Sequence, residues 1–149
     1  MNINWGRAIL AGLIGTAVMT MVGVWVAPMM GMPAMNPADM LAKAMGGSIA
    51  LGWLGHFMIG TVLAVIYALV APRLSGPMWV RGALYGIAPW LLAQVVVMPM
   101  MGMPVFSGSM VIALGSLVGH LVYGAVVGAV YGSGIGSPAP AHASPAGVR

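Results

Sequence analysis

Two stretches of similar sequence, GHFMIGTVLAVIY at residues 55–67 and GHLVYGAVVGAVY at residues 119–131, decide the fold class. Each lies inside a longer apolar run without Asp, Glu or Lys, and about 20 apolar residues are enough to cross the hydrocarbon core of a membrane. Because backbone groups in lipid must form their hydrogen bonds within their own segment, such runs are helices rather than strands. The sequence therefore predicts an all-α integral membrane four-helix bundle, with spans at residues 3–27, 49–71, 79–98 and 109–131.

The composition agrees with a membrane environment. Of the 149 residues, 61% are hydrophobic and 4% are charged, whereas about a quarter of the residues of a soluble domain carry charge. Cysteine is absent, which excludes disulfides and thiolate metal sites. The five basic residues form no patch, so nucleic acid is not an expected partner. We expect one transmembrane domain over residues 1–132 and a mobile tail, rich in Pro and Ala, over residues 133–149.

The few charges predict an orientation. Four of the five basic residues lie on one side of the expected bundle, and Lys43 lies on the other. Because basic residues are retained on the cytoplasmic side, both termini are expected in the cytoplasm, and the loops at residues 31–48 and 104–108 are expected outside. The residues that mark the cytoplasmic side are Arg7, Arg73, Arg81 and Arg149.

The chain contains an internal repeat. The hexapeptide PMMGMP occurs at residues 28–33 and again at residues 99–104, each time after an odd-numbered span. Together with the two stretches quoted above, it predicts two tandem, duplicated transmembrane hairpins at residues 5–67 and 79–131. Since each unit crosses the membrane twice, both enter it in the same direction, and a two-fold axis near the membrane normal would relate them.

Each unit places one histidine on a stripe of small residues. Spacings of four residues put these positions on one face of a helix, and small residues on such a face let helices pack closely. We therefore expect the histidines to face the bundle interior and to meet across the two-fold axis. The stripes consist of His56, Gly60 and Ala64 in the second span, and of His120, Gly124 and Gly128 in the fourth.

Three roles are open for His56 and His120. An ionisable residue inside a span is a candidate functional site because placing it in hydrocarbon is costly. Neutral imidazoles could bind the iron of a b-type haem or another metal, with the nearby glycines leaving room for the macrocycle. The pair could also relay protons, or each ring could form a hydrogen bond that fixes the register of its helix.

Methionines gather after the first and third spans, on the expected outer side. Thioethers are soft ligands that suit Cu(I), so copper is a candidate ligand there. Methionine is also an adaptable filler of apolar contacts, which requires no metal. We expect no cofactor as the first interpretation, with haem b or copper as the alternatives. The methionines concerned are Met29, Met30, Met32, Met100, Met101 and Met103.

Other residues point to structural roles. Thr20 and Gln94 occupy equivalent positions in the first and third spans and are expected to form hydrogen bonds across helix contacts. Pro89 lies inside the third span, where a proline kinks a helix. Aromatic residues at the span ends are expected to form the belt at the cytoplasmic interface, as is common in membrane proteins. These residues are Trp5, Tyr67, Trp79 and Tyr131.

The stretches GLIGTAVMTMV at residues 12–22 and GSLVGHLVYGAVVGAVYG at residues 115–132 resemble a family of small bacterial four-span membrane proteins without an assigned function. The resemblance covers about residues 1–132 and implies a location in the bacterial inner membrane. Asp39 is the only acidic residue, so paired-carboxylate chemistry and a Ser-His-Asp relay cannot be built within one chain.

We therefore expect a non-enzymatic inner-membrane protein, first an accessory or assembly component of a membrane complex. A haem- or metal-binding protein that uses the His pair is the alternative, and a small transporter or proton pathway is the next. Besides the lipid bilayer, the expected partners are a second copy of the chain or another membrane protein, because stripes of glycine favour association between helices.

Overall fold

The structure, a computed structural model, describes residues 3–133. This part of the chain is helical and contains no strand, which confirms the predicted fold class. Four helical segments are long and apolar enough to cross a membrane. The predicted tail falls almost entirely on residues 134–149, outside the described residues. The four segments are Trp5–Met29, Ile49–Arg73, Met78–Met100 and Met110–Gly132.

The first and third segments are built alike. Each is a long α-helix followed by a π-helix and a last short α-helical turn. The π-helices precede Pro28 and Pro99. Proline has no N–H to donate, and its ring clashes with the carbonyl one α-helical turn earlier, so the backbone hydrogen bonds before it span five residues instead of four. The elements are α1 (Trp5–Met21), η1 (Val22–Val26) and α2 (Ala27–Met29), and α5 (Met78–Leu92), η3 (Ala93–Val97) and α6 (Met98–Met100).

The second and fourth segments contain no π-helix. They are α4 (Ile49–Val70), which ends in the 3₁₀ turn η2 (Ala71–Arg73), and α7 (Met110–Gly132). Serine caps both N-termini: Ser48 Oγ accepts a hydrogen bond from the N–H of Leu51, and Ser109 Oγ accepts one from the N–H of Ile112. Each cap satisfies an N–H that the helix itself leaves without a partner.

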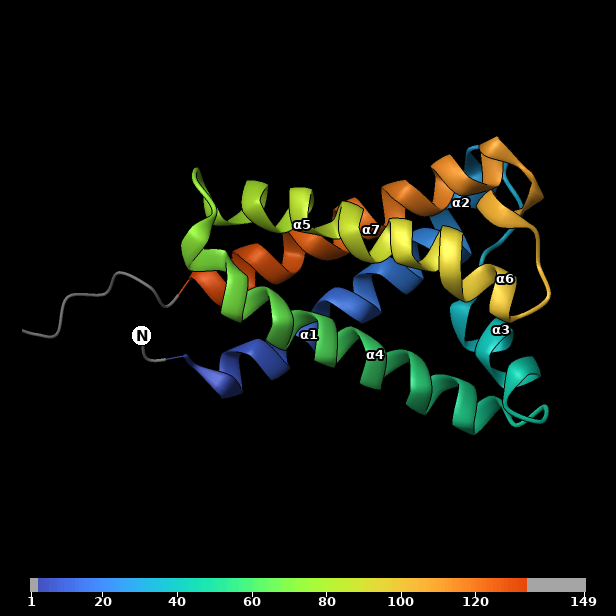
Figure 1. Cartoon of the computed structure of the whole chain (residues 1–149), viewed down its shortest axis with the longest axis horizontal. Coiled ribbons are helices and arrows are strands. Elements are labelled where there is room, and N and C mark those ends of the chain that lie inside the picture. Colours follow the sequence, from blue (N-terminus) through green and yellow to red (C-terminus); the bar gives the residue numbers. More distant parts are fainter. Residues whose placement is uncertain (1–2, 134–149) are drawn as a thin grey trace, which may run out of the picture.

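One helix was not predicted. The loop expected at residues 31–48 contains α3 (Pro37–Ala44), which packs against α4. Its start follows ordinary capping rules, since the side chain of Asn36 accepts from the N–H of Ala38 and Pro37 occupies the first turn. The other connection contains the short 3₁₀ segment η4 (Val105–Gly108). Figure 1 shows α2, α3 and α6 at one end of the bundle, opposite the start of α1 and the link between α4 and α5.

Glycine faces hold the helices together. On α5 and α7, a methyl group at Gly82 would overlap the backbone of Gly124, and one at Gly128 would overlap the carbonyl of Met78. On α1 and α4, Gly60 lies against Thr16. Such contacts let backbones approach to distances that a side chain would prevent. Of the four residues predicted for helix packing, Gly60, Gly124 and Gly128 lie at these contacts, and Ala64 is fully buried opposite Gly12.

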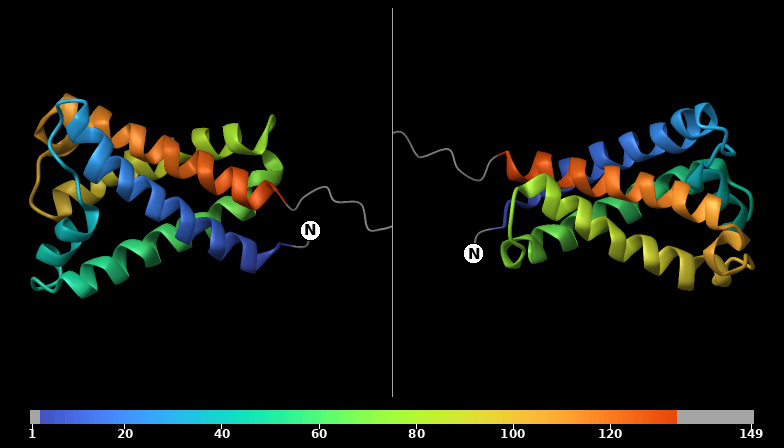
Figure 2. Two further views of the ribbon diagram at one scale, coloured as in Figure 1. Left: turned by 180° about the vertical axis from the view of Figure 1, so that it is seen from behind. Right: turned by 90° about the horizontal axis from the view of Figure 1, so that it is seen from above.

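The helix contacts follow a two-fold relation only in part. α1 packs along both α4 and α7, whereas α5, its counterpart in the proposed repeat, packs along α7 but has few contacts with α4. Figures 1 and 2 show α4 and α5 close together at their link and apart at the other end. The shared order of elements in the first and third segments agrees with the repeat, but the duplication itself stays a prediction.

A layer of tyrosines fills the bundle where α4 and α5 are close. The rings of Tyr67 and Tyr85 lie 5.4 Å apart, and Tyr67 and Tyr131 lie 6.2 Å apart. The prediction that Tyr67 and Tyr131 belong to an interfacial belt is therefore wrong: both are buried, because Tyr67 donates to the carbonyl of Met78 and the two rings pack edge to face. Trp5 and Trp79 are more than half exposed, as a belt requires.

Candidate functional site

A cavity of about 330 Å³ lies where α4 and α5 part. Residues of α1, α4, α5 and α7 line its sides, and Pro37, Met40 and Leu41 of α3 close it at the end of the bundle. At its other end the cavity is bordered by Tyr123, which belongs to the same buried core as Tyr67 and Tyr131. Because the lining is mostly apolar and a few polar groups converge on it, the cavity has the ordinary composition of a small-molecule site.

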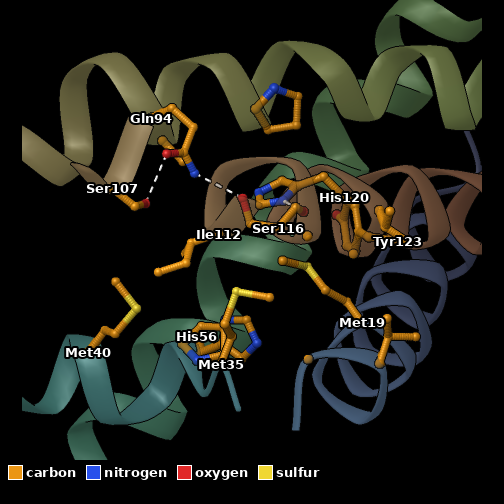
Figure 3. Close-up of a pocket in the computed structure, with 18 of the residues that line it drawn as sticks. Met19, Met35, Met40, His56, Gln94, Ser107, Ile112, Ser116, His120 and Tyr123 are labelled. Atoms are coloured by element: carbon orange, nitrogen blue, oxygen red, sulfur yellow. Dashed lines mark hydrogen bonds between the residues drawn. The ribbon is translucent and has the colours of Figure 1, made fainter. Parts of the chain in front are cut away.

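Both predicted histidines line this cavity. His56 of α4 and His120 of α7 lie on two sides of it, with methionine side chains between them (Figure 3). They face the interior, as expected, although no hydrogen bond joins one described ring to the other. Their role as ligands of a cofactor stays a prediction.

Half of the sixteen methionines line the same cavity. Four of the predicted six are among them: Met30, Met32, Met101 and Met103. Met29 and Met100 are not, because they lie in the last helical turns of α2 and α6 and are 86% and 81% exposed. These two residues lie outside the cavity, and their role as metal ligands stays a prediction. The methionines that sequence reasoning did not assign to the site are Met19, Met35, Met40 and Met98.

The π-helix η1 explains how Met35 reaches the site. In a π-helix the carbonyl of Gly23 would pair with the nitrogen of Pro28, which has no proton to donate. Instead this carbonyl accepts a hydrogen bond of 3.0 Å from the N–H of Met35. The bond ties the connection between α2 and α3 back onto the first segment. The only signal in the sequence is the proline at residue 28.

The hydrogen bonds of His56 determine its tautomer. Thr20 Oγ1 donates its single proton to the carbonyl of Thr16 at 2.8 Å. It can therefore only accept from His56 Nε2, which lies 3.0 Å away. We therefore assign the proton of the His56 ring to Nε2 and the lone pair to Nδ1.

His120 has the opposite tautomer. Its Nδ1 lies 2.8 Å from the carbonyl oxygen of Ser116, which can only accept a hydrogen bond, so Nδ1 carries the proton and Nε2 carries the lone pair. In the described residues, no buried side-chain nitrogen or oxygen lacks a hydrogen-bond partner. The other two ring nitrogens, His56 Nδ1 and His120 Nε2, form no hydrogen bond within this part of the chain. Since every fully buried side-chain nitrogen there has a partner, these two atoms are not fully buried. Both rings line the cavity.

A polar network lies at the α3 end of the cavity. Gln94 Nε2 donates to Ser116 Oγ at 2.9 Å, and Ser107 Oγ donates to Gln94 Oε1 at 3.0 Å. Trp90 Nε1 donates to the carbonyl of Ala113 at 3.0 Å. The network holds η4 against η3 and α7, which explains how Ser107 keeps a left-handed φ of 56°. The expectation that Thr20 and Gln94 bond across helix contacts matches the bonds to His56 and Ser116.

The cavity is free of formal charge. Among the described residues that line it there is no Asp, Glu, Lys or Arg. The part of the chain that the structure describes also contains no group of three His, Cys, Asp or Glu able to hold a metal ion. A metal at this place would need thioethers beside the imidazoles, and the propionates of a haem would find no cationic partner in the cavity wall.

Comparison with known proteins identifies one relation. The model of a family of unknown function, DUF6789, matches residues 3–142 of the chain. No curated protein and no solved structure matches the chain. The function must therefore be argued from the geometry.

Proposed function

We propose, from the premise that this chain belongs to the DUF6789 family of unknown function, that it is a non-enzymatic protein of the bacterial inner membrane that binds a small neutral molecule dissolved in the bilayer. The apolar body of the ligand occupies the cavity, and its polar group meets His56 or His120. The protein acts as an accessory component that holds such a molecule for a partner in the membrane.

The absence of charge from the described cavity lining carries this proposal. Burying an ion there would cost several kcal/mol because no opposite charge compensates its lost hydration. A neutral molecule has no such loss of hydration energy, and its apolar surface contacts protein in the cavity in place of lipid. The volume of about 330 Å³ lies at the lower end of the range of small-molecule sites, about 300–1,000 Å³.

The methionines support a ligand-binding role. Thioether side chains are unbranched and polarizable, so they adapt to apolar partners of different shape. A bundle that needed only rigid packing would gain more from branched aliphatic residues, which lose less freedom when ordered. The cavity is instead lined by eight methionines.

The same charge-free lining makes the alternatives less suitable. A b-type haem would bury its propionates without a cationic partner, and a proton pathway needs a chain of titratable groups, whereas only two histidines and Tyr123 line the described cavity. Copper(I) is the metal that imidazole and thioether ligands would suit. Met32 Sδ lies against Gly115, one turn before Gly119 and His120, and this contact is the observation that favours copper.

The proposal can be tested by photolabelling. We expect 1-naphthol that carries a diazirine to label cavity residues such as Met19 and Leu63 when the protein is held in lipid nanodiscs, and excess 1-naphthol to abolish the labelling. Labels confined to the exposed residues Leu84 and Val111, or labels unaffected by the competitor, would contradict the proposal. A haem absorption band or stoichiometric copper in the purified protein would favour the alternatives instead.

The proposed orientation places both termini in the cytoplasm, which the distribution of arginines supports. Since the chain has no cysteine, single introduced cysteines report it cleanly. In spheroplasts, a membrane-impermeant maleimide is expected to label Met45→Cys, and to label Ser75→Cys only after permeabilisation. Both positions are exposed outside the long helices. The reverse pattern would invert the orientation.

A further inference from the structure

We infer that the ligand is an aromatic diol of the hydroquinone class, held as a hydrogen-bond donor by both histidines. This inference rests on the proposed binding function and names its ligand. It follows from which polar atoms of the cavity still have hydrogen-bonding capacity.

The two histidines present acceptors only. His56 Nδ1 and His120 Nε2 carry the lone pairs, because the other nitrogen of each ring donates to Thr20 or to the carbonyl of Ser116. No carboxylate lines the described cavity to stabilise a doubly protonated ring. A partner for these nitrogens must therefore bring its own proton.

The hydroxyl groups around the cavity are already used as donors. Each has one proton, and each gives it to an acceptor within the protein. A ligand that only accepts hydrogen bonds, such as a quinone or an ether, finds no hydroxyl donor there. The side-chain donor that the described bonds leave over is the second N–H of Gln94, at the α3 end of the cavity and away from the two histidines. The bonds run from Thr16 to the carbonyl of Gly12, from Ser107 to Gln94 Oε1, from Ser116 to the carbonyl of Ala113 and from Tyr123 to the carbonyl of Gly60.

The positions of the two acceptors select the shape of the ligand. His56 projects from α4 and His120 from α7, on two sides of an apolar space lined by methionine and isoleucine side chains (Figure 3). A molecule with one hydroxyl donates a hydrogen bond to one of these nitrogens and leaves the other without a partner. A flat apolar ring with hydroxyls at opposite positions offers a donor to each side. The cavity therefore favours the reduced, dihydroxy form of a compound over its oxidised, dicarbonyl form.

The test compares three ligands with the same ring system under anaerobic conditions in nanodiscs: 1,4-dihydroxynaphthalene, 1,4-dimethoxynaphthalene and 1,4-naphthoquinone. After subtraction of partitioning into empty nanodiscs, we expect the diol to bind at least about tenfold more tightly than the other two, since hydrogen bonds at a desolvated site contribute about 1 kcal/mol each.

His56→Phe and His120→Phe separate recognition from folding. Each variant keeps an aromatic ring but removes one acceptor. In His56→Phe the hydroxyl of Thr20 keeps its bond to the carbonyl of Thr16, and in His120→Phe the carbonyl of Ser116 keeps its place in the α-helix, so neither change leaves a buried polar group unpaired. Each variant is expected to lose most of the preference for the diol, measured as the ratio of its affinity for the diol to its affinity for the dimethoxy compound. Leu84→Phe, at an exposed position on α5, is the matched control and should keep the preference.

The outcomes distinguish the two proposals. Equal affinity of the wild type for the three compounds, or a preference that survives both histidine substitutions, would overturn the diol assignment while leaving a binding cavity. Absence of binding of all three compounds above empty nanodiscs would overturn the proposed function and the diol assignment together.

Discussion

Replacing Gly82 by leucine is expected to separate α5 from α7 and to lower the free energy of unfolding by about 3 kcal/mol or more, the range of severe overpacking. The first side-chain carbon at this position would overlap the carbonyl of Gly124 and approach the backbone nitrogen of Gly128. A flexible side chain could rotate away, but the backbone of a packed helix cannot. The helices must therefore move apart along their contact.

The measurement is thermal or denaturant-induced unfolding of the purified protein in mild detergent. Gly6→Leu is the matched control, because only Asn4 Oδ1, at 3.8 Å, would lie near its new side chain. The control should unfold close to the wild type. Equal loss of stability in Gly82→Leu and Gly6→Leu would show that the close contact of α5 with α7 does not hold the bundle together.

Hydropathy was enough to predict the four spans, and small-residue spacing was enough to predict the packing stripes. Lipid leaves a polypeptide few options, because every backbone group must pair within its own helix. α3 escaped prediction because eight residues are too few for a hydropathy signal, although Asn36 and Pro37 are recognisable start signals. The π-helices before Pro28 and Pro99 arise because proline has no N–H to donate, and the spacing of apolar residues does not reveal this.

The candidate site was predicted in outline. The spacing of each stripe predicts that His56 and His120 face the interior, since glycines on these stripes pack α4 on α1 and α7 on α5. The tautomers depend on Thr20 and Ser116, whose distances to the rings require a three-dimensional structure. The two copies of PMMGMP behave alike: Met29 and Met100, which occupy equivalent positions, are both exposed, and the sequence does not separate them from the methionines that line the cavity.

Gly119→Leu is expected to fill the cavity and to weaken ligand binding by at least about 30-fold, or ~2 kcal/mol, the usual cost of overfilling an apolar space. Gly119 lies beside His120 in the cavity wall, and the nearest atom to a methyl group there would be Met19 Cγ at 3.6 Å, an ordinary contact. The new side chain therefore takes the space of the ligand without displacing a helix. Folding should be retained, in contrast to Gly82→Leu.

Whether this cavity binds a neutral membrane-soluble molecule is decided by the dissociation constant of 1-naphthol for nanodisc-embedded wild type, Gly119→Leu and Gly6→Leu. We expect saturable binding above empty nanodiscs for the wild type and Gly6→Leu, and its near-complete loss in Gly119→Leu while the unfolding transition is kept. Equal binding by all three proteins, or partitioning no greater than that into empty nanodiscs, would show that the cavity does not hold such a molecule.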